Sequence, residues 1–356
     1  MAICLIGLGS NLGDRQVHLE RAVRRLAELP QVRVLAGSSY LRTPPVGGPS
    51  GQGEFLNAAL RIETSLSAWE LLQSLQQIEQ QGGRRPGPRW GPRPVDLDLL
   101  LYGDHVLRTP QLELPHPRLS FRRFVLQPAV EVAADMMHPV AGWTIRELYD
   151  HLDSTVSYVA IAGGIGAGKT ELAYRTVQAL SDSYGIAAHV LEQPPLRNQA
   201  ARTAGHGNSA GLSWRTEIEF LDQRAKVLNK QRWPSDGGWV LSDFWFGQAL
   251  AFAQVWLEAD RLPEFKAQFD QRCAQVATPK LRVVLRSSTD DLMRAIAQRG
   301  GRDQQSLDRA TVDRLRSELE RRAAERGRGP VLAVDAAEQE TNVDELAAAI
   351  AAMKKI

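Results

Sequence analysis

The sharpest local pattern in the sequence is a glycine-rich run in its second half. It reads Gly163-Gly-Ile-Gly166-Ala-Gly168-Lys169-Thr170 and fits G-x-x-x-x-G-K-[ST]. The glycines let backbone N–H groups turn inward around phosphate oxygens. Lys169 supplies a positive charge, and the Thr170 hydroxyl is placed to bind Mg²⁺. Because an apolar run precedes the motif and a helical pattern follows it, we expect a loop that binds the phosphates of ATP.

Two carboxylates of this half follow apolar runs that read as strands. Glu192 follows Ala187–Leu191, and Asp243 follows Trp239–Ser242. Ligands of open α/β sheets bind outside the carboxyl ends of the strands, so both acids are candidate site residues. Glu192 is the candidate base for a substrate hydroxyl. An Asp at a strand end also caps helices, and this alternative stays open for Asp243.

Further charged candidates lie on predicted helices. Glu217 opens the helical stretch Glu217–Arg224, while Arg299 and Arg302 belong to an arginine cluster that follows the apolar run Leu281–Leu285. A lid that closes over a transferring phosphate needs such positive charges. The same arginines also suit a solvated helical face, and the sequence does not decide between the two.

A second pattern with chemical potential lies in the first half. Asp96 and Asp98 are two residues apart in an apolar run, so on a strand they share one face. Two such carboxylates repel each other unless a cation neutralises them, and hard oxygen ligands suit Mg²⁺. Arg84 and Arg93 stand just upstream, in a Gly/Pro-rich loop that can clamp phosphates. The alternative to such a site is that the two acids lie on a solvated strand edge and that the basic loop binds nothing.

Adjacent and alternating strands and helices in the first half predict an α+β sandwich with helices on a sheet. The strands are expected at Ile3–Leu8, Val32–Tyr40, Phe55–Glu63 and Val95–Tyr102, and the helices at Arg15–Leu29 and Ala68–Gln80. In the second half, strand candidates separated by long helical stretches predict a doubly wound parallel sheet with helices on both faces. They are Tyr158–Ala162, Ala187–Leu191, Trp239–Ser242, Leu281–Leu285 and Val331–Val334. We therefore expect an α/β protein with domains 1–153 and 158–356.

Bulk composition limits the function classes. The chain has 356 residues, a net charge of +2 and two cysteines, which gives no global attraction to nucleic acid and no disulfide or zinc spacing. The N-terminal apolar run is short and lacks a basic segment, and no run approaches the roughly 20 apolar residues of a membrane span. We expect a reduced, cytoplasmic protein that binds no membrane.

Several motifs of the first half stand in an order typical of one enzyme family. They are Gly7-Leu-Gly9-Ser10-Asn11, Arg42-Thr43-Pro44-Pro45-Val46, Phe55-Leu-Asn57, Arg89-Trp90-Gly91 through Asp98, Pro115-His116-Pro117-Arg118 and Arg122-Arg123-Phe124. Over residues 1–152 the sequence resembles 6-hydroxymethyl-7,8-dihydropterin pyrophosphokinases, which implies a ferredoxin-like sandwich and pyrophosphate transfer from ATP to the pterin, with release of AMP.

The resemblance also implies a role for each matching residue. Asp96 and Asp98 hold Mg²⁺, and Arg84 and Arg93 act on the phosphates. The residues implied to bind ATP are Glu79, Trp90, Arg93, His116 and Arg122. The residues implied to bind the pterin are Thr43, Pro44, Val46, Phe55, Asn57 and Phe124. One departure is Pro86, which stands where relatives often have a second arginine and which stiffens the loop.

The second half, over residues 158–353, resembles deoxynucleoside kinases. This resemblance implies that Glu192 is the base for the sugar 5′-hydroxyl, Asp243 a site carboxylate and Arg299 and Arg302 lid residues. Two departures are Phe244 after Asp243, where many relatives have arginine, and Glu217 at a position where glutamine commonly reads the base. Glu217 accepts where an amide donates, so no base preference carries over.

The main interpretation is a bifunctional transferase, in which the second half is an active kinase, and two alternatives stand beside it. In the first alternative the second half is a silent nucleotide-binding or assembly module. A homodimer through this half is left open. A nucleic-acid-binding protein that uses the basic loop 82–93 predicts steep salt dependence, which the near-neutral charge and the lack of a binding motif disfavour. The expected partners are thus small molecules: the pterin, ATP and a deoxynucleoside.

Overall fold

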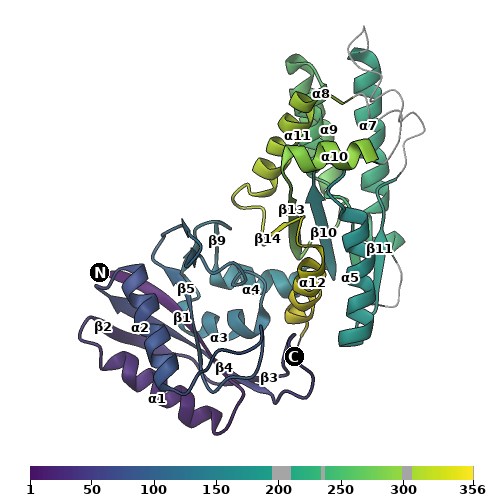
Figure 1. Cartoon of the computed structure of the whole chain (residues 1–356). Coiled ribbons are helices and arrows are strands. Elements are labelled where there is room, and N and C mark those ends of the chain that lie inside the picture. The colour runs from purple at the N-terminus through teal and green to yellow at the C-terminus, as the bar shows by residue number, and fades with distance from the viewer. Residues whose placement is uncertain (195–209, 234–236, 299–306, 356) are drawn as a thin grey trace. The chain divides into compact units, whose positions relative to one another are not determined.

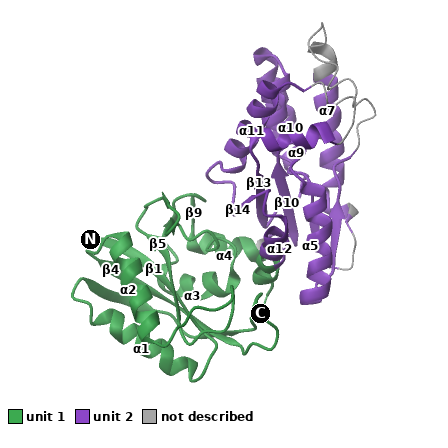
Figure 2. Ribbon diagram, viewed as in Figure 1, with its two compact units in different colours: residues 1–154, 348–356 green, residues 155–347 purple. Residues whose placement is uncertain are grey.

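The chain forms two compact units in a computed structural model that describes residues 1–194, 210–233, 237–298 and 307–355 (Figure 1). The first unit comprises Met1–Ser154 together with Ala348–Ile356, and the second comprises Thr155–Ala347 (Figure 2). The return of the last residues to the first unit has no signal in the sequence.

The first unit is built on an antiparallel sheet. Its strands are β1 (Ala2–Ser10), β2 (Val32–Gly37), β3 (Leu41–Thr43), β4 (Phe55–Thr64) and β5 (Asp96–Tyr102). The order is β2-β4-β1-β5, and β3 pairs with β4. Every strand pair is antiparallel, so the prediction of strands and helices that build one α+β unit is confirmed.

The predicted strand Val32–Tyr40 is too long. A register shift lies between Val34 and Ala36, and β2 ends at Gly37. The Ser38 hydroxyl then accepts a hydrogen bond from the Ala59 backbone N–H at 2.9 Å, which takes the place of a ladder carbonyl. A side chain that bonds to backbone in this way competes with the strand ladder.

Apolar positions at helical spacing hold two helices against this sheet. The helices are α1 (Arg15–Ala27) and α2 (Ala68–Gln81). Leu71, Leu75 and Ile78 of α2 are buried in one cluster with the inward side chains of β1. Helix α2 begins at a capping box in which Ser67 and Glu70 satisfy each other's backbone N–H groups. This fixed start positions Glu79 near the other end of the helix.

The first unit also contains two helices and two short hairpins. They are α3 (Arg123–Ala133), α4 (Ile145–Ser154), the pair β6 (Leu107–Arg108) and β7 (Glu113–Leu114), and the pair β8 (Met137–His138) and β9 (Trp143–Thr144). Helix α3 contacts β4 and β1 and carries site residues at its start.

The second unit is built on a parallel sheet, as predicted. Its strands are β10 (Tyr158–Gly163), β11 (Ala188–Leu191), β12 (Trp239–Ser242), β13 (Leu281–Arg286) and β14 (Val331–Asp335). All adjacent pairs are parallel, in the order β11-β12-β10-β13-β14. The order reverses direction beside β10, and ligands of open α/β sheets bind where such a reversal occurs.

Helices and short 3₁₀ turns lie between these strands, and a last helix follows the final strand. They are α5 (Lys169–Tyr184), α7 (Ala210–Val227), α8 (Gln248–Trp256), α9 (Leu262–Cys273), α10 (Thr289–Gln298), α11 (Arg309–Ala323) and α12 (Gln339–Met353), with 3₁₀ turns Lys230–Arg232 and Ala259–Arg261. Helix α12 runs on into the residues from Ala348 that belong to the first unit. Among the described residues, none of the helices has the length and apolar character needed to cross a membrane.

Candidate active sites

A cavity of about 160 Å³ opens in the first unit beside Asp96 and Asp98 of β5. Strands β1, β4 and β5, the loop before β5 and the start of α3 all contribute to its walls. The predicted site residues that line it are Thr43, Pro44, Val46, Phe55, Asn57, Trp90, Arg93, Asp96, Asp98, His116, Arg122 and Phe124. The structure therefore brings together residues that are up to 81 positions apart in the sequence, from Thr43 to Phe124 (124 − 43).

The strand periodicity of β5 places its two acids at this cavity. Leu97 and Leu99 are buried, whereas Asp96 and Asp98 alternate with them and line the hollow. Opposite Asp96 in the register of β1 stands Gly9. A Cβ atom at Gly9 would lie 3.8 Å from the Cβ of Asp96, so its absence leaves room at the cavity floor.

The two carboxylates affect each other electrostatically. Burial raises the pKa of Asp96, and the charge of Asp98 raises it further, while Arg93 and Arg84 oppose both effects. The Arg93 and Arg84 guanidinium groups lie 2.9 Å and 2.7 Å from the Asp96 carboxylate. The pair of acids thus attracts cations, and two arginines already meet one of its carboxylates.

Glu79 and Arg84 line a second hollow of about 360 Å³ next to the first one, which Arg93 shares. Arg84 forms an ion pair with Glu79 as well as with Asp96. Glu79 also accepts a hydrogen bond from the Leu97 backbone N–H at 2.7 Å. Burial raises the pKa of Glu79 to about 7, although the Leu97 N–H and Arg84 act against the shift. These contacts join helix α2 to strand β5 next to Asp96.

Two loops meet at Trp90, which has a positive φ of 58°. The Trp90 carbonyl accepts a hydrogen bond from the Gln52 side-chain amide at 3.1 Å, and that amide also bonds to the Gly47 carbonyl. Asn11 donates to the Gln52 side chain and accepts from the Arg93 backbone N–H. Gln52 stands in no motif that would single it out in the sequence, because its role depends on the distance between two loops.

The remaining predicted residues of this unit are held by local contacts. Asn57 and Thr43 are both buried, and the Asn57 amide donates to the Thr43 hydroxyl at 2.9 Å. The Arg122 guanidinium lies 5.5 Å from the Phe124 ring centre. His116 donates its backbone N–H to Leu100 of β5, which fixes its place next to the acids.

In the second unit the glycine-rich run forms the turn between β10 and α5. Gly166 and Gly168 have φ angles of 89° and 85°, which favour glycine. Lys169 donates from Nζ to the carbonyls of Gly163 and Gly164 at 3.1 and 2.8 Å. The run therefore folds as a tight loop that ends at the N-terminus of a helix, where anions bind readily.

Thr170 and Asp243 meet across the reversal point of the sheet. The Thr170 hydroxyl donates to Asp243 Oδ2 at 2.6 Å, and Asp243 Oδ1 accepts from the Gln193 backbone N–H at 2.6 Å. Glu192, which is exposed, accepts a hydrogen bond from the Tyr174 hydroxyl of α5. The loops that follow β10, β11 and β12 thus converge on one place.

Three residues that the sequence did not single out, Gln193, Arg224 and Gln248, are joined by hydrogen bonds next to Asp243. Arg224 donates to the Gln193 side chain at 2.9 Å, and Gln248 donates to it at 2.8 Å. Arg224 is fully buried, with its guanidinium 4.9 Å from the Phe220 ring centre. Glu217, also buried, lies seven residues before Arg224, so the two share a helix face. That spacing is the signal by which Arg224 could have been found.

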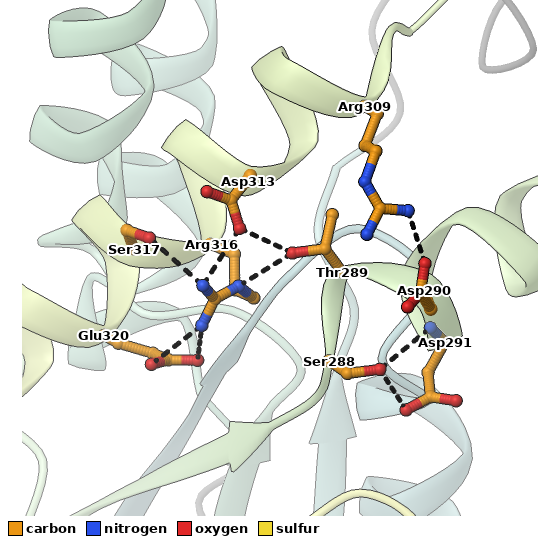
Figure 3. A network of polar contacts seen from close by, with 9 residues as sticks. All are labelled: Ser288, Thr289, Asp290, Asp291, Arg309, Asp313, Arg316, Ser317 and Glu320. Atoms are coloured by element: carbon orange, nitrogen blue, oxygen red, sulfur yellow. Dashed lines mark hydrogen bonds and ion pairs between the residues drawn. The ribbon is translucent and has the colours of Figure 1, made fainter.

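The predicted lid residues Arg299 and Arg302 lie outside the described residues. The helices on either side of them, α10 and α11, are joined by a polar network (Figure 3). In it the Thr289 hydroxyl donates to Asp313 at 2.6 Å, and Arg316 contacts both residues and Glu320.

Comparison with known proteins identifies the first unit. The model of the family described as 7,8-dihydro-6-hydroxymethylpterin-pyrophosphokinase matches residues 5–134. A 2-amino-4-hydroxy-6-hydroxymethyldihydropteridine pyrophosphokinase of Synechocystis sp. is 39% identical over 164 residues, 46% of this chain and 83% of that protein. The enzyme of the same name from Bacillus subtilis is 48% identical over 130 residues, 36% of this chain and 77% of that protein. The chain belongs to the 7,8-dihydro-6-hydroxymethylpterin-pyrophosphokinase family.

Solved structures give a weaker likeness. The structure of deoxyadenosine kinase from M. mycoides with bound dATP superimposes with a TM-score of 0.44 at 16% identity, over 53% of this chain and 96% of that chain. The structure of the same enzyme with bound dCTP gives a TM-score of 0.42. A likeness at this level supports no conclusion about activity, so the role of the second unit rests on its own residues.

Proposed function

We propose that the first unit transfers pyrophosphate from ATP to 6-hydroxymethyl-7,8-dihydropterin and releases AMP, a step of folate biosynthesis. The observation that carries the proposal is a single cavity lined by a carboxylate pair, arginines and two phenylalanines. The order β2-β4-β1-β5 with two helices packed on the sheet supports a ferredoxin-like sandwich.

The residues of the cavity divide between the two substrates. Phe55 and Phe124 offer flat apolar faces to a pterin ring, and the Asn57 side chain hydrogen-bonds its polar edge. Thr43, Pro44 and Val46 contact the ring from the neighbouring loop. Positioning of the hydroxymethyl oxygen for in-line attack on the β-phosphorus accounts for most of the catalysis in such a reaction.

The remaining residues serve ATP and its metal ions. Asp96 and Asp98 present only hard carboxylate oxygens at one place, which suits Mg²⁺. Mg²⁺, when bound, neutralises the charge of the transferring phosphates. Arg84, Arg93 and Arg122 bind phosphate oxygens, and the residues assigned to the rest of ATP are Glu79, Trp90 and His116.

The test is AMP release from ATP in the presence of the pterin. Asp98→Asn removes a charged ligand but keeps the size of the side chain, and it is expected to lower the rate at least about a hundredfold. Asp104→Asn, an exposed acid just beyond β5, is the matched control and is expected to leave the rate unchanged. Turnover near the wild-type rate in Asp98→Asn would contradict the assignment.

We propose that the second unit is an ATP-dependent kinase for the 5′-hydroxyl of a deoxynucleoside. The supporting observation is the convergence of the glycine loop, the hydrogen-bonded pair Thr170 and Asp243, and Glu192 beside β11. Lys169 and the loop glycines hold phosphates, Thr170 helps to hold Mg²⁺, and Glu192 accepts the hydroxyl proton. Glu217 and Asp243 contact the nucleoside, and Arg299 and Arg302 remain proposed lid residues.

The second candidate is a nucleotide-binding module without turnover. It is favoured by Phe244, a fully buried core residue at the position where the resemblance to deoxynucleoside kinases implies an arginine. The full chain is incubated with ATP, Mg²⁺ and each deoxynucleoside in turn, with Lys169→Ala as the control. Monophosphate formed by the wild type and lost in Lys169→Ala supports the kinase, whereas ATP binding without any monophosphate supports the module.

A further inference from the structure

A third hollow, of about 240 Å³, lies in the second unit away from the glycine loop. Arg282 of β13 lines it, and this residue pairs in register with Ala160 of β10. Gly163, where the glycine loop begins, pairs with Leu285. The two places are thus three residues apart along the strands, roughly 10 Å. Of the residues assigned to the proposed nucleotide site, none that the structure describes lines this cavity.

Arg282 is unusual among the residues that line the cavity, because it is charged and yet only 2% exposed. Its Nη2 donates to the Gly329 carbonyl at 3.1 Å, but Nε and Nη1 have no hydrogen-bond partner among the residues that the structure describes. Within those same residues no carboxylate forms an ion pair with Arg282. A buried cation without a counter-charge is costly, and burial, with the charge of Arg328, lowers the pKa of Arg282 to about 10.

The other charges at the cavity are already paired. Arg322 lies 2.6 Å from Glu318, and Arg328 lies 3.2 Å from Glu325. Glu325 attracts Arg282 as well, but burial and the charge of Arg328 outweigh this attraction. Arg282 therefore leaves a net positive potential in the hollow. A neutral ring partly stabilises it, since the guanidinium lies 5.2 Å from the Trp245 ring centre.

The apolar part of the lining is largely aromatic. Trp245, Phe246 and Phe269 all contribute, and the rings of Phe246 and Phe269 are stacked at 4.9 Å. The volume is below the roughly 300–1,000 Å³ of pockets for drug-sized ligands, so a nucleotide is too large. The walls suit a small flat molecule.

We propose that this cavity binds a small aromatic carboxylate. The anion offsets the charge of Arg282 across a region of low dielectric, where attraction between opposite charges is strong. The ring of the ligand packs against the aromatic walls, which contribute dispersion and burial of apolar area. Inorganic phosphate carries the charge without the ring, and benzyl alcohol carries the ring without the charge.

Cys273 supplies the readout, because it lines the cavity and is exposed, whereas the other cysteine of the chain, Cys4, is buried. The rate at which a thiol reagent labels the native full-length protein therefore follows Cys273. Benzoate is expected to slow labelling in proportion to occupancy, about tenfold near ten times its Kd. Inorganic phosphate and benzyl alcohol are expected to protect far less.

Two variants separate binding from folding. Arg282→Met is expected to abolish protection by benzoate, and Arg286→Met, an exposed position on the same strand, is expected to retain it. If Arg282→Met fails to fold, the probes compared on the wild type still decide. Equal protection by benzyl alcohol, equal protection by phosphate, undiminished protection in folded Arg282→Met, or no protection by benzoate would each overturn the proposal.

Discussion

Arg84 and Arg93 place two guanidinium groups against one carboxylate oxygen of Asp96. This arrangement neutralises a buried acid whose neighbour Asp98 carries the same charge. A divalent cation that binds the acids must compete with these arginines for the same oxygen. The loop before β5 carries both arginines, so its position affects how tightly a metal ion can bind to Asp96.

Removal of Arg84 is expected to tighten the binding of divalent metal without nucleotide. In Arg84→Ala both the competing ion pair and a repelling charge are gone, so we expect about tenfold tighter Mn²⁺ binding, or about 1.4 kcal/mol. Free Mn²⁺ measured by electron paramagnetic resonance reports the change. Arg85→Ala removes an equal charge from the next residue, which is exposed, and is expected to have a smaller effect. Weaker binding in Arg84→Ala would show that Arg84 and the metal do not compete.

How far the site follows from the sequence depends on the range of each contact. Asp96 and Asp98 were found because strand periodicity is local. Gln52 was not, because its hydrogen bond to Trp90 spans 38 residues between two loops. Arg224 lies in between: helical spacing relates it to Glu217, but only the fold shows that it reaches Gln193.

At the scale of elements, the loop before β4 and the loop before β5 dock on each other at two glycines. A Cβ atom at Gly47 would lie 2.5 Å from the Trp90 ring, and one at Gly48 would lie 2.2 Å from the Trp90 carbonyl. Real Cβ atoms do not approach so closely. The glycines therefore set the distance between the loops and the position of Trp90 in the cavity.

Gly48→Ala is expected to separate the two loops. The expected result is a loss of roughly tenfold in kcat/KM for AMP release, about 1.4 kcal/mol. Gly51→Ala is a close control, because Gly48 and Gly51 have φ angles of 78° and 79°, while a Cβ at Gly51 meets nothing within 4 Å. Both variants carry the same backbone strain, so a similar loss in each would assign the effect to strain rather than to the docking of the loops.

The β8–β9 hairpin contains a buried histidine with consequences for stability. Its Nδ1 accepts a hydrogen bond from the Ala141 backbone N–H at 3.1 Å, and burial lowers the pKa of His138 to about 4. The unfolded chain takes up a proton near the usual value of 6.5, and the folded hairpin does not. The stability contribution is therefore complete above pH 6.5 and is lost as the pH falls toward 4.

His138→Asn is expected to flatten this pH dependence. The loss in the wild type is on the order of 3 kcal/mol at most. Hydrogen exchange of residues 136–145 at pH 7 and pH 5, corrected for intrinsic rates, measures it locally. Equal acceleration of exchange in the wild type and in His138→Asn would show that the histidine is not responsible.

At the scale of the whole molecule, the two units carry separate cores and separate candidate sites. We expect Lys169→Ala to leave AMP release within about twofold of the wild type, and Asp98→Asn to leave deoxynucleoside phosphorylation equally unaffected. Both activities are measured on the same full-length preparation. A loss of one activity on mutation of the other site would reveal coupling that the separate sites do not suggest.

The five parallel strands of the second unit were predicted because each is a compact apolar run between helical stretches. The short elements were not. Strand β3 depends on its pairing with β4, and the two-residue strands of the hairpins are too short to show a pattern of their own. Arg299 and Arg302 remain predictions, outside the residues that the structure describes.

The final residues of the chain make contacts that a shortened version of the first unit would lose. Arg123, at the start of α3 beside Arg122 and Phe124, donates to the Met353 carbonyl at 3.4 Å and pairs with Asp153, which Lys355 also meets at 3.3 Å. A gene cut after codon 154 would delete Met353 and Lys355. The shortened protein would then lack the carbonyl acceptor of the Arg123 Nε–H at the start of α3.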